Sequence, residues 1–368
     1  MLRMSRRFVP VCIALLAALA MGCSPKTESP AEAPAAAAKK PAFKVAWSIY
    51  VGWMPWEYAG SSGILKKWAD KYGIEIELTQ INDYVESINQ YTAGKYDACV
   101  MTNMDMLTIP SAGGVDSTAV ILGDYSNGND GVVLKGGGKK LVDIKGQSVN
   151  LVELSVSHYL LARGLASVGL KESDVKVVNT SDADIVAAYA TPDVTATVTW
   201  KPLLSEVLAS QKSSLVFDSS KTPGEILDLM VVNTKVLKEH PELGKALVGA
   251  WYEIMALMQA KDEAANAALT SMAKASGTDL AGFNEQLATT YMYWQASDAV
   301  AAISNPDLLA KMDLVRSFSF EKGLLGAGAK SVDAVGIEFP GGKTLGNAQA
   351  PTMRFDASYM QLAADGKL

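Results

Sequence analysis

The stretch WSIYVGWMPWEY, residues 47–58, gathers three tryptophans and two tyrosines around a single glutamate, in a chain with only seven tryptophans. An aromatic face attracts a cation through its quadrupole, which contributes roughly 0.5–2 kcal/mol per face. A carboxylate adds charge-assisted hydrogen bonds and suits a planar fork of N–H donors. These residue types together predict a site for a small planar ligand that is cationic or amide-like.

The candidate residues of this stretch follow the first predicted strand, where Pro55 restricts the backbone. They are Tyr50, Trp53, Trp56 and Glu57. Two alternatives stay open for them: the tryptophans also suit core packing, as does Trp47, and Glu57 also suits a solvated acid at a helix start.

Polar and aromatic residues at other predicted strand ends complete the candidate site, because ligands of open α/β sheets bind beyond the carboxyl ends of the strands. They are Asp83, Asn103, Asp105, Asp124, Tyr125, Glu153, Ser155 and Trp200. Asn103 and Asp105 equally suit helix N-caps. Burying several unpaired carboxylates is costly, so we expect the site to use one or two of these acids. Their number favours a cationic or neutral amide ligand over an anion.

Alternating strands and helices must position these residues. FKVAWSI, IEIEL, DACVM and TAVIL read as strands, and GILKKWADKYG and YVESINQYTAG between them read as helices that stop at glycine. After the turn-rich SNGNDG and KGGGKK, a second strand–helix series runs to SSLVF. This rhythm predicts an α/β protein in which each domain is a mostly parallel sheet flanked by helices.

The strand DLMVVN, residues 228–233, is expected to return to the first sheet, so the second domain is inserted in the first. We therefore predict domain I over residues 43–130 plus 228–368 and domain II over residues 131–227. The chain after 234 is expected to be helical to about 304 and irregular and glycine-rich after 318.

The N-terminus predicts secretion. Arg3, Arg6 and Arg7 precede a short apolar run, and ALAMGCS resembles a bacterial lipobox. We expect residues 1–22 to be a lipoprotein signal peptide and Cys23 to carry the lipid, with an ordinary signal cleaved nearby as the alternative. Residues 23–42, rich in Pro, Ala and charge, predict a disordered tether. The protein is thus expected in the periplasm or on the outer cell surface, held to the membrane by its lipid.

Composition excludes several functions. A formal charge of −6 without a basic stripe argues against nucleic acid. Two histidines cannot build a multi-histidine zinc site, and Cys99 is expected to be a buried core thiol. No Gly-x-Ser-x-Gly elbow or Cys/His pair supports an enzyme, and we expect no catalytic residue, metal or cofactor.

Several segments resemble the solute-binding proteins of ABC importers for sulfonates, taurine, nitrate and thiamine precursors, the NMT1-like group. YTAGKYDACVMT, LVDIKGQSVNL and DVTATVTWKPLL carry this likeness, although Thr195 stands where the group often has Asp. More narrowly, FKVAWSIYVGWMPWEYA and the tail from RSFSFEKGLLG onward resemble binding proteins encoded beside urea carboxylase, a group associated with guanidine breakdown. The resemblance covers about residues 43–368.

This resemblance implies a two-domain periplasmic-binding-protein fold of type II, with the ligand between the domains. It implies a monomer that captures a guanidine- or urea-type solute by hinge closure and delivers it to permease and ATPase subunits. In sulfonate or nitrate binders a helix N-terminus, here near Ser155, holds an anion with backbone N–H groups. A small-anion binder and a ligand sensor are therefore the alternative functions.

Overall fold

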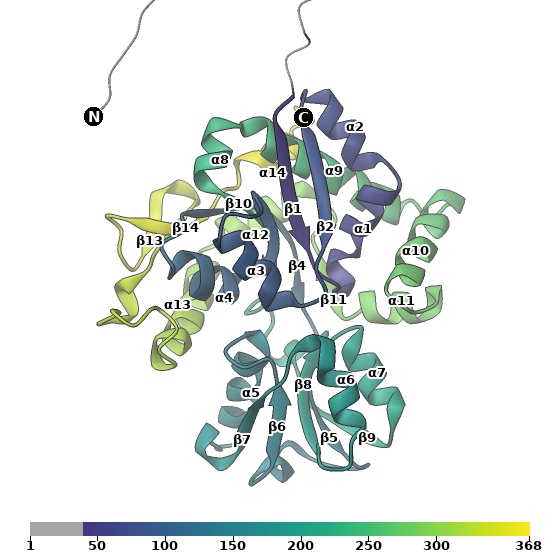
Figure 1. The fold of residues 1–368 in the computed structure, drawn as a ribbon, viewed down its shortest axis with the longest axis vertical. Coiled ribbons are helices and arrows are strands. Elements are labelled where there is room, and N and C mark those ends of the chain that lie inside the picture. The colour runs from purple at the N-terminus through teal and green to yellow at the C-terminus, as the bar shows by residue number, and fades with distance from the viewer. Residues whose placement is uncertain (1–39) are drawn as a thin grey trace, which may run out of the picture. The chain divides into compact units, whose positions relative to one another are not determined.

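The predicted strands and helices assemble around two separate sheets in a computed structural model that describes residues 40–368 (Figure 1). The predicted signal peptide, the predicted lipidation at Cys23 and nearly all of the expected tether lie outside the described residues. Residues 40–368 cluster as one unit. No helix among them is long and apolar enough to cross a membrane.

A nine-stranded sheet has the order β13-β12-β14-β4-β10-β3-β1-β2, with β11 paired to β4. Its strands are β1 (Ala42–Trp47), β2 (Glu75–Gln80), β3 (Ala98–Thr102), β4 (Ser117–Ser126), β10 (Leu227–Asn233), β11 (Thr290–Met292), β12 (Gly336–Phe339), β13 (Lys343–Leu345) and β14 (Pro351–Phe355). β1 pairs parallel with β2 and β3, whereas β10 lies antiparallel between β3 and β4. The sheet is therefore mixed rather than mostly parallel, because β10 returns from the second sheet in the opposite direction.

Helices surround this sheet, and we call the whole assembly lobe I. They are α1 (Met54–Ser61), α2 (Ile64–Lys71), α3 (Tyr84–Thr92), α4 (Asn103–Met106), α8 (Thr234–Glu239), α9 (Pro241–Gln259), α10 (Glu263–Ala275), α11 (Leu280–Leu287), α12 (Ala296–Ser304), α13 (Pro306–Glu321) and α14 (Ser358–Ala364). The predicted helical stretch from 234 to 304 is interrupted by β11, an edge strand that pairs with the end of β4.

A five-stranded sheet of order β7-β6-β8-β5-β9 forms lobe II, drawn in teal in Figure 1. It contains β5 (Asp130–Lys135), β6 (Ser148–Leu151), β7 (Lys176–Asn179), β8 (Ala196–Trp200) and β9 (Ser213–Asp218), with helices α5 (Val156–Ser167), α6 (Asp182–Ala190) and α7 (Leu203–Ser210). The chain passes between the lobes twice, from β4 to β5 and from β9 to β10. The predicted domain boundaries at residues 130 and 228 remain a prediction.

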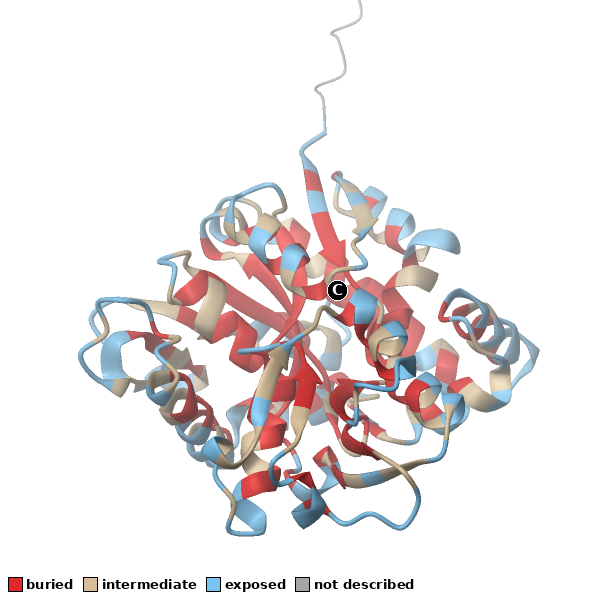
Figure 2. Cartoon of the chain, turned by 60° about the horizontal axis from the view of Figure 1, so that its bottom comes forward, coloured by how far each residue is buried: buried red, intermediate tan, exposed pale blue. Residues whose placement is uncertain are grey.

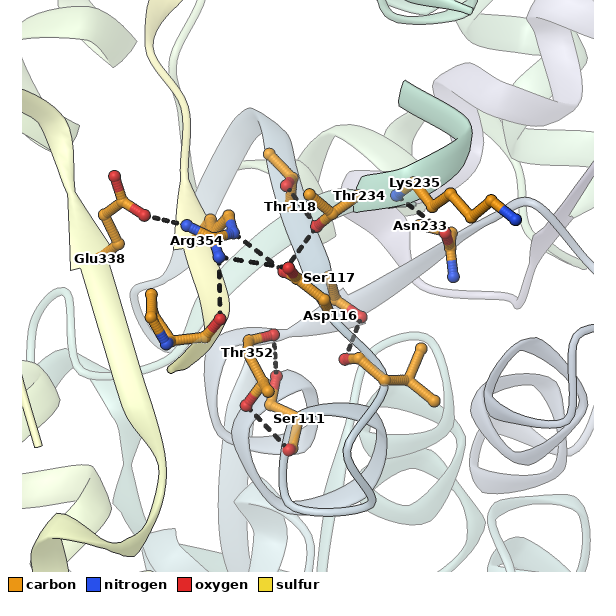
Figure 3. A network of polar contacts seen from close by, with 12 residues as sticks. Ser111, Asp116, Ser117, Thr118, Asn233, Thr234, Lys235, Glu338, Thr352 and Arg354 are labelled. Carbon is orange, nitrogen blue, oxygen red and sulfur yellow. Dashed lines mark hydrogen bonds and ion pairs between the residues drawn. The ribbon is translucent and has the colours of Figure 1, made fainter. Parts of the chain in front are cut away.

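The tail after Phe318 was predicted to be irregular, and the structure corrects this: it forms β12, β13, β14 and α14. The strand β14 pairs parallel with β4, and Arg354 of β14 forms ion pairs with Asp116, just before β4, and with Glu338 of β12 (Figure 3). Such pairing joins residues more than 230 positions apart, so the glycine-rich local pattern does not reveal it.

Apolar side chains of the strands fill the core, and the exposed residues lie on the outer helix faces and in loops (Figure 2). Cys99 of β3 is a free, buried thiol as predicted. Lobe II has its own apolar cluster around Val149 and Leu160. Each lobe therefore has a core of its own and forms one side of the space between the two sheets.

Candidate functional site

The aromatic stretch runs from the end of β1 through a short 3₁₀ turn into α1. Tyr50 precedes a 3₁₀ turn that ends at Trp53, and α1 begins at Met54 with Pro55 at its start. Tyr50 and Trp53 lie edge to face, with ring centroids 5.1 Å apart. Trp53 is buried, and its Nε1 has no hydrogen-bond partner among the residues that the structure describes. An unpaired buried donor is available to a ligand.

A small cavity lies between the two lobes beside these residues, and about 20 Å³ of it is open to the centre of a water-sized molecule. It is lined by Tyr50, Trp53, Tyr84, Thr102, Asp130, Val156, Trp200, Ile226 and Asp228. Four of the lining residues are aromatic. Tyr84 bridges the lobes, since its ring centroid lies 5.6 Å from that of Trp53 and 5.8 Å from that of Trp200. Aromatic side chains of both lobes thus form walls of this cavity, which we call the aromatic box.

Two aspartates of lobe I meet at the edge of this box. Asp124 of β4 and Asp228 of β10 are register partners on neighbouring antiparallel strands, and both are buried. The Tyr50 hydroxyl donates to Oδ1 of Asp124 over 2.9 Å. Burial, then the charge of Asp124, raises the pKa of Asp228 well above its ordinary value, and burial also raises the pKa of Asp124. Like charges directly opposite each other in a sheet are unfavourable unless something compensates them.

The backbone at Gly52 packs against the same pair. A Cβ placed on residue 52 would lie 2.5 Å from Oδ2 of Asp124. A side chain is therefore excluded there. Asp228 lines the cavity, whereas Asp124 does not.

A third carboxylate comes from lobe II. Asp130 begins β5 and is the register partner of Trp200 across β5 and β8. It accepts a hydrogen bond from Ser126, whose hydroxyl also contacts that of Ser219, so the two segments that cross between the lobes are tied together beside the cavity. Burial raises the pKa of Asp130 to about 6.

Asp105 supports the box from behind. It accepts hydrogen bonds from the Tyr84 hydroxyl over 2.6 Å and from the Thr102 hydroxyl over 2.8 Å. Burial raises the pKa of Asp105 to about 6. Asp105 therefore orients the Tyr84 ring and does not itself line the cavity.

The structure places several predicted site residues away from the cavity. Trp56 is buried in lobe I and stacks on Trp251, with centroids 5.2 Å apart, because it lies on the α1 face that packs into the core. Glu57 lies in the first turn of α1, where burial raises its pKa. Tyr125 stacks on Tyr291 of the edge strand β11. These three side chains do not line the cavity.

The remaining predicted residues act in local structure. Asp83 and Ser155 are the N-caps of α3 and α5, accepting from the backbone N–H groups of Glu86 and Ser157. Asn103 is fully paired, accepting from the Leu227 backbone and donating to a backbone carbonyl. Glu153 is exposed. Of the predicted set, the cavity is lined by Tyr50, Trp53 and Trp200, with Asp124 and Asp105 directly behind its wall.

Sequence reasoning missed Asp228 and Asp130 among the residues that line the cavity. One signal was present: Asp228 stands in the run ILDLMVV, where a charged residue interrupts a buried strand. Asp130 stands in a turn-rich segment that gave no such signal.

The charges of the site favour a cationic ligand. Three buried carboxyl groups surround the aromatic box, and within residues 40–368 no Lys or Arg forms an ion pair with any of them. A buried anion here would meet these carboxyl groups and no basic side chain, whereas a cation would compensate their charge. No group of three His, Cys, Asp or Glu in this part of the chain is arranged to hold a metal ion.

Contacts between the lobes lie on both sides of the cavity. On one side Lys322, directly after α13, forms an ion pair with Glu172 of lobe II, and the His158 ring packs edge-on against Phe318. On the other side the Lys201 ammonium donates to Thr289 over 2.9 Å. The lobes therefore meet around the cavity.

Comparisons with known proteins agree on the fold. Residues 46–273 match the NMT1-like family. The taurine-binding periplasmic protein of Escherichia coli (strain K12) is 26% identical over 144 residues, 38% of this chain and 44% of that protein. A putative binding protein of Brucella abortus (strain 2308) is 22% identical over 49% of this chain and 56% of its own length. The chain thus spans about half the length of these curated relatives.

Solved structures are similar over more of the chain. The periplasmic aliphatic sulphonate binding protein of Escherichia coli superposes with a TM-score of 0.64 and 18% identity, covering 78% of this chain and 94% of that one. The periplasmic nitrate-binding protein of Synechocystis PCC 6803 gives 0.62 and 10% identity, covering 89% of both chains. These likenesses confirm the predicted two-lobed, type II periplasmic-binding-protein fold.

Proposed function

The chain belongs to the NMT1-like family, and from this we propose that it is the substrate-binding component of an ABC importer for a small nitrogenous cation of the guanidine type. The family is one of periplasmic binding proteins without enzymatic activity, in agreement with the prediction that the chain is not an enzyme. The proposed partners are the permease and ATPase subunits of the importer.

The observation that carries the choice of ligand is the aromatic box with buried carboxyl groups at its wall. Trp53, Tyr84 and Trp200 offer ring faces, and Asp228 and Asp130 offer acceptors. A guanidinium ion is planar, positively charged and all donor, so it matches both features. The likeness of residues 43–368 to binding proteins encoded beside urea carboxylase supports the same class.

Capture follows from the two-lobed arrangement. Trp53 and Asp228 come from lobe I, whereas Trp200 and Asp130 come from lobe II. A ligand that contacts both pairs binds the closed form better than the open form and shifts the population toward closure. The permease then recognises the closed form in this mechanism.

A small anion is the second candidate, because named relatives bind taurine, sulphonates and nitrate. The cavity opposes an anion, since its lining includes the carboxyl groups of Asp130 and Asp228 and no basic side chain. A sensor that reports the same ligand to a membrane partner would use the same cavity.

Thermal unfolding of the purified chain tests the ligand class. Guanidinium chloride from micromolar to low millimolar is compared with sodium chloride at equal concentration, and with urea, taurine and nitrate. A ligand at 100 times its Kd stabilises by about 2.7 kcal/mol, which raises Tm by a few degrees. We expect the rise with guanidinium. A rise with taurine or nitrate alone would replace the cation by the anion.

We also propose the N-terminal lipid anchor, which rests on the ALAMGCS motif outside the described residues. Cys23→Ser removes the thiol that would carry the lipid. We expect the variant to move from the membrane fraction to the soluble periplasmic fraction, measured by fractionation and immunoblotting. An unchanged distribution of wild type and variant would indicate an ordinary secreted protein.

A further inference from the structure

Asp124 and Asp228 form a carboxyl pair that the protein does not neutralise. Their Cα atoms are register partners in adjacent antiparallel strands, so their side chains lie next to each other on one face of the sheet. The Oδ2 atoms of both are buried and face no hydrogen-bond donor among residues 40–368. Asp228 lines the cavity, whereas Asp124 lies behind it.

The groups that face this pair offer no positive charge. Tyr50, before α1, donates its hydroxyl hydrogen to Asp124. Asp130 of β5 adds a further negative charge that acts on both members, and Tyr293, after β11, also faces Asp124. The Trp251 ring of α9 packs against Gly123, next to Asp124, and is uncharged. No ion pair within the described lobes includes Asp124, Asp130 or Asp228.

Two carboxylates in contact in a buried site cannot both stay ionised without a cation. One bound proton resolves the conflict, because the protonated member donates to the ionised one. The tyrosine hydroxyl already stabilises ionised Asp124, so Asp228 is the member that holds the proton. Asp228 is also the member that a ligand can touch.

We propose that the Asp124–Asp228 pair is a proton–cation exchange site, which carries one proton when the cavity is empty and releases it to solvent when a small organic cation binds. The inference rests on the proposed cationic ligand and adds the way in which its binding is regulated. The O–H bond of the protonated carboxyl group breaks, its proton goes to solvent, and the bound cation takes over the charge-balancing role of that proton.

Exchange makes affinity depend on pH. The pKa of the pair is raised because burial favours its protonated form, and the cation favours the ionised form. Below the pKa of the empty pair a proton must therefore leave for each cation that binds. Affinity should fall about tenfold for each pH unit of acidification in that range and level off above it. Guanidinium itself keeps its charge throughout, so the dependence comes from the protein.

Isothermal titration calorimetry of the purified chain with guanidinium chloride counts the protons. Titrations at pH 6 in buffers with different ionisation enthalpies give the protons released per ligand from the slope of observed enthalpy against buffer enthalpy. We expect about one proton per ligand, and a value near zero in Asp228→Asn if that variant still binds measurably. Tight binding by wild type with no proton release at pH 6 would overturn the exchange and leave the proposed function standing.

A measurement without ligand tests separately whether the empty Asp124–Asp228 pair carries a proton. Infrared difference spectra between wild type and Asp228→Asn at pH 7 should show the carbonyl stretch of a buried carboxylic acid in wild type only. Glu57→Gln, which changes a carboxyl group outside the cavity, is the matched control and should keep the band. If guanidinium does not bind at all, the proposed function is wrong. The infrared band still shows whether the pair carries a proton. Its absence from wild type would overturn the proton-carrying pair.

Discussion

Asp228→Asn is expected to weaken guanidinium binding by at least about 30-fold, because truncating one partner of a buried charge pair costs about 2–5 kcal/mol. Asn keeps the size and one acceptor of the side chain but removes the charge that faces the cavity. The fold should survive, since Asn, like protonated Asp228, is uncharged and can donate a hydrogen bond to Asp124 across β4 and β10. We expect the Tm of the ligand-free variant to equal or exceed that of wild type.

Calorimetric titration of wild type, Asp228→Asn and Glu57→Gln measures this effect. Glu57 is the matched control: it is the one carboxylate of the aromatic stretch, and it lies in α1 outside the cavity lining. Glu57→Gln should keep affinity within about twofold, as expected for a charge screened from the ligand. Equal weakening in both variants would mean that the whole acidic surface attracts the cation and that the cavity does not hold it.

Trp56→Ala is expected to lower the free energy of unfolding by about 3–5 kcal/mol, the usual cost of truncating a buried tryptophan. Trp56 is 1% exposed and stacks on Trp251, so the substitution leaves a hole in the core of lobe I. Three positions earlier, Trp53 lines the cavity. Trp53→Ala should instead weaken guanidinium binding by the loss of one aromatic face, about 0.5–2 kcal/mol.

Differential scanning calorimetry is the suitable stability measurement for this pair, because both common chemical denaturants resemble the proposed ligand. The folded fraction of Trp56→Ala should bind guanidinium with wild-type affinity, and Trp53→Ala should retain most of the wild-type Tm. The reverse pattern, with binding lost in Trp56→Ala and retained in Trp53→Ala, would move the site from the cavity to the face of α1.

The nature of the site was readable from local sequence, whereas its exact members were not. Aromatic residues next to the end of the first strand are a local signal, and Tyr50 and Trp53 do line the cavity. Trp53 and Trp56 cannot be told apart in this way, because the choice depends on where the 3₁₀ turn passes into α1. That point is set by how α1 packs against α9 and α10, which are encoded some 190 residues later.

For the carboxylates, too, the sequence indicated the residue type, and the tertiary structure decided which residues meet. Asp124 was expected near the segment between the lobes, but its opposition to Asp228 depends on the antiparallel register of β4 and β10, 104 positions apart. The mixed sheet and the C-terminal strands β12–β14 also depend on such long-range pairing. By itself the sequence determined the alternation of strands and helices, the buried Cys99 and the aromatic and acidic character of the site. These follow from the periodicity and composition of neighbouring residues. Only the tertiary structure decided which rings and which acids meet, because register and packing are set by partners that are distant in the chain.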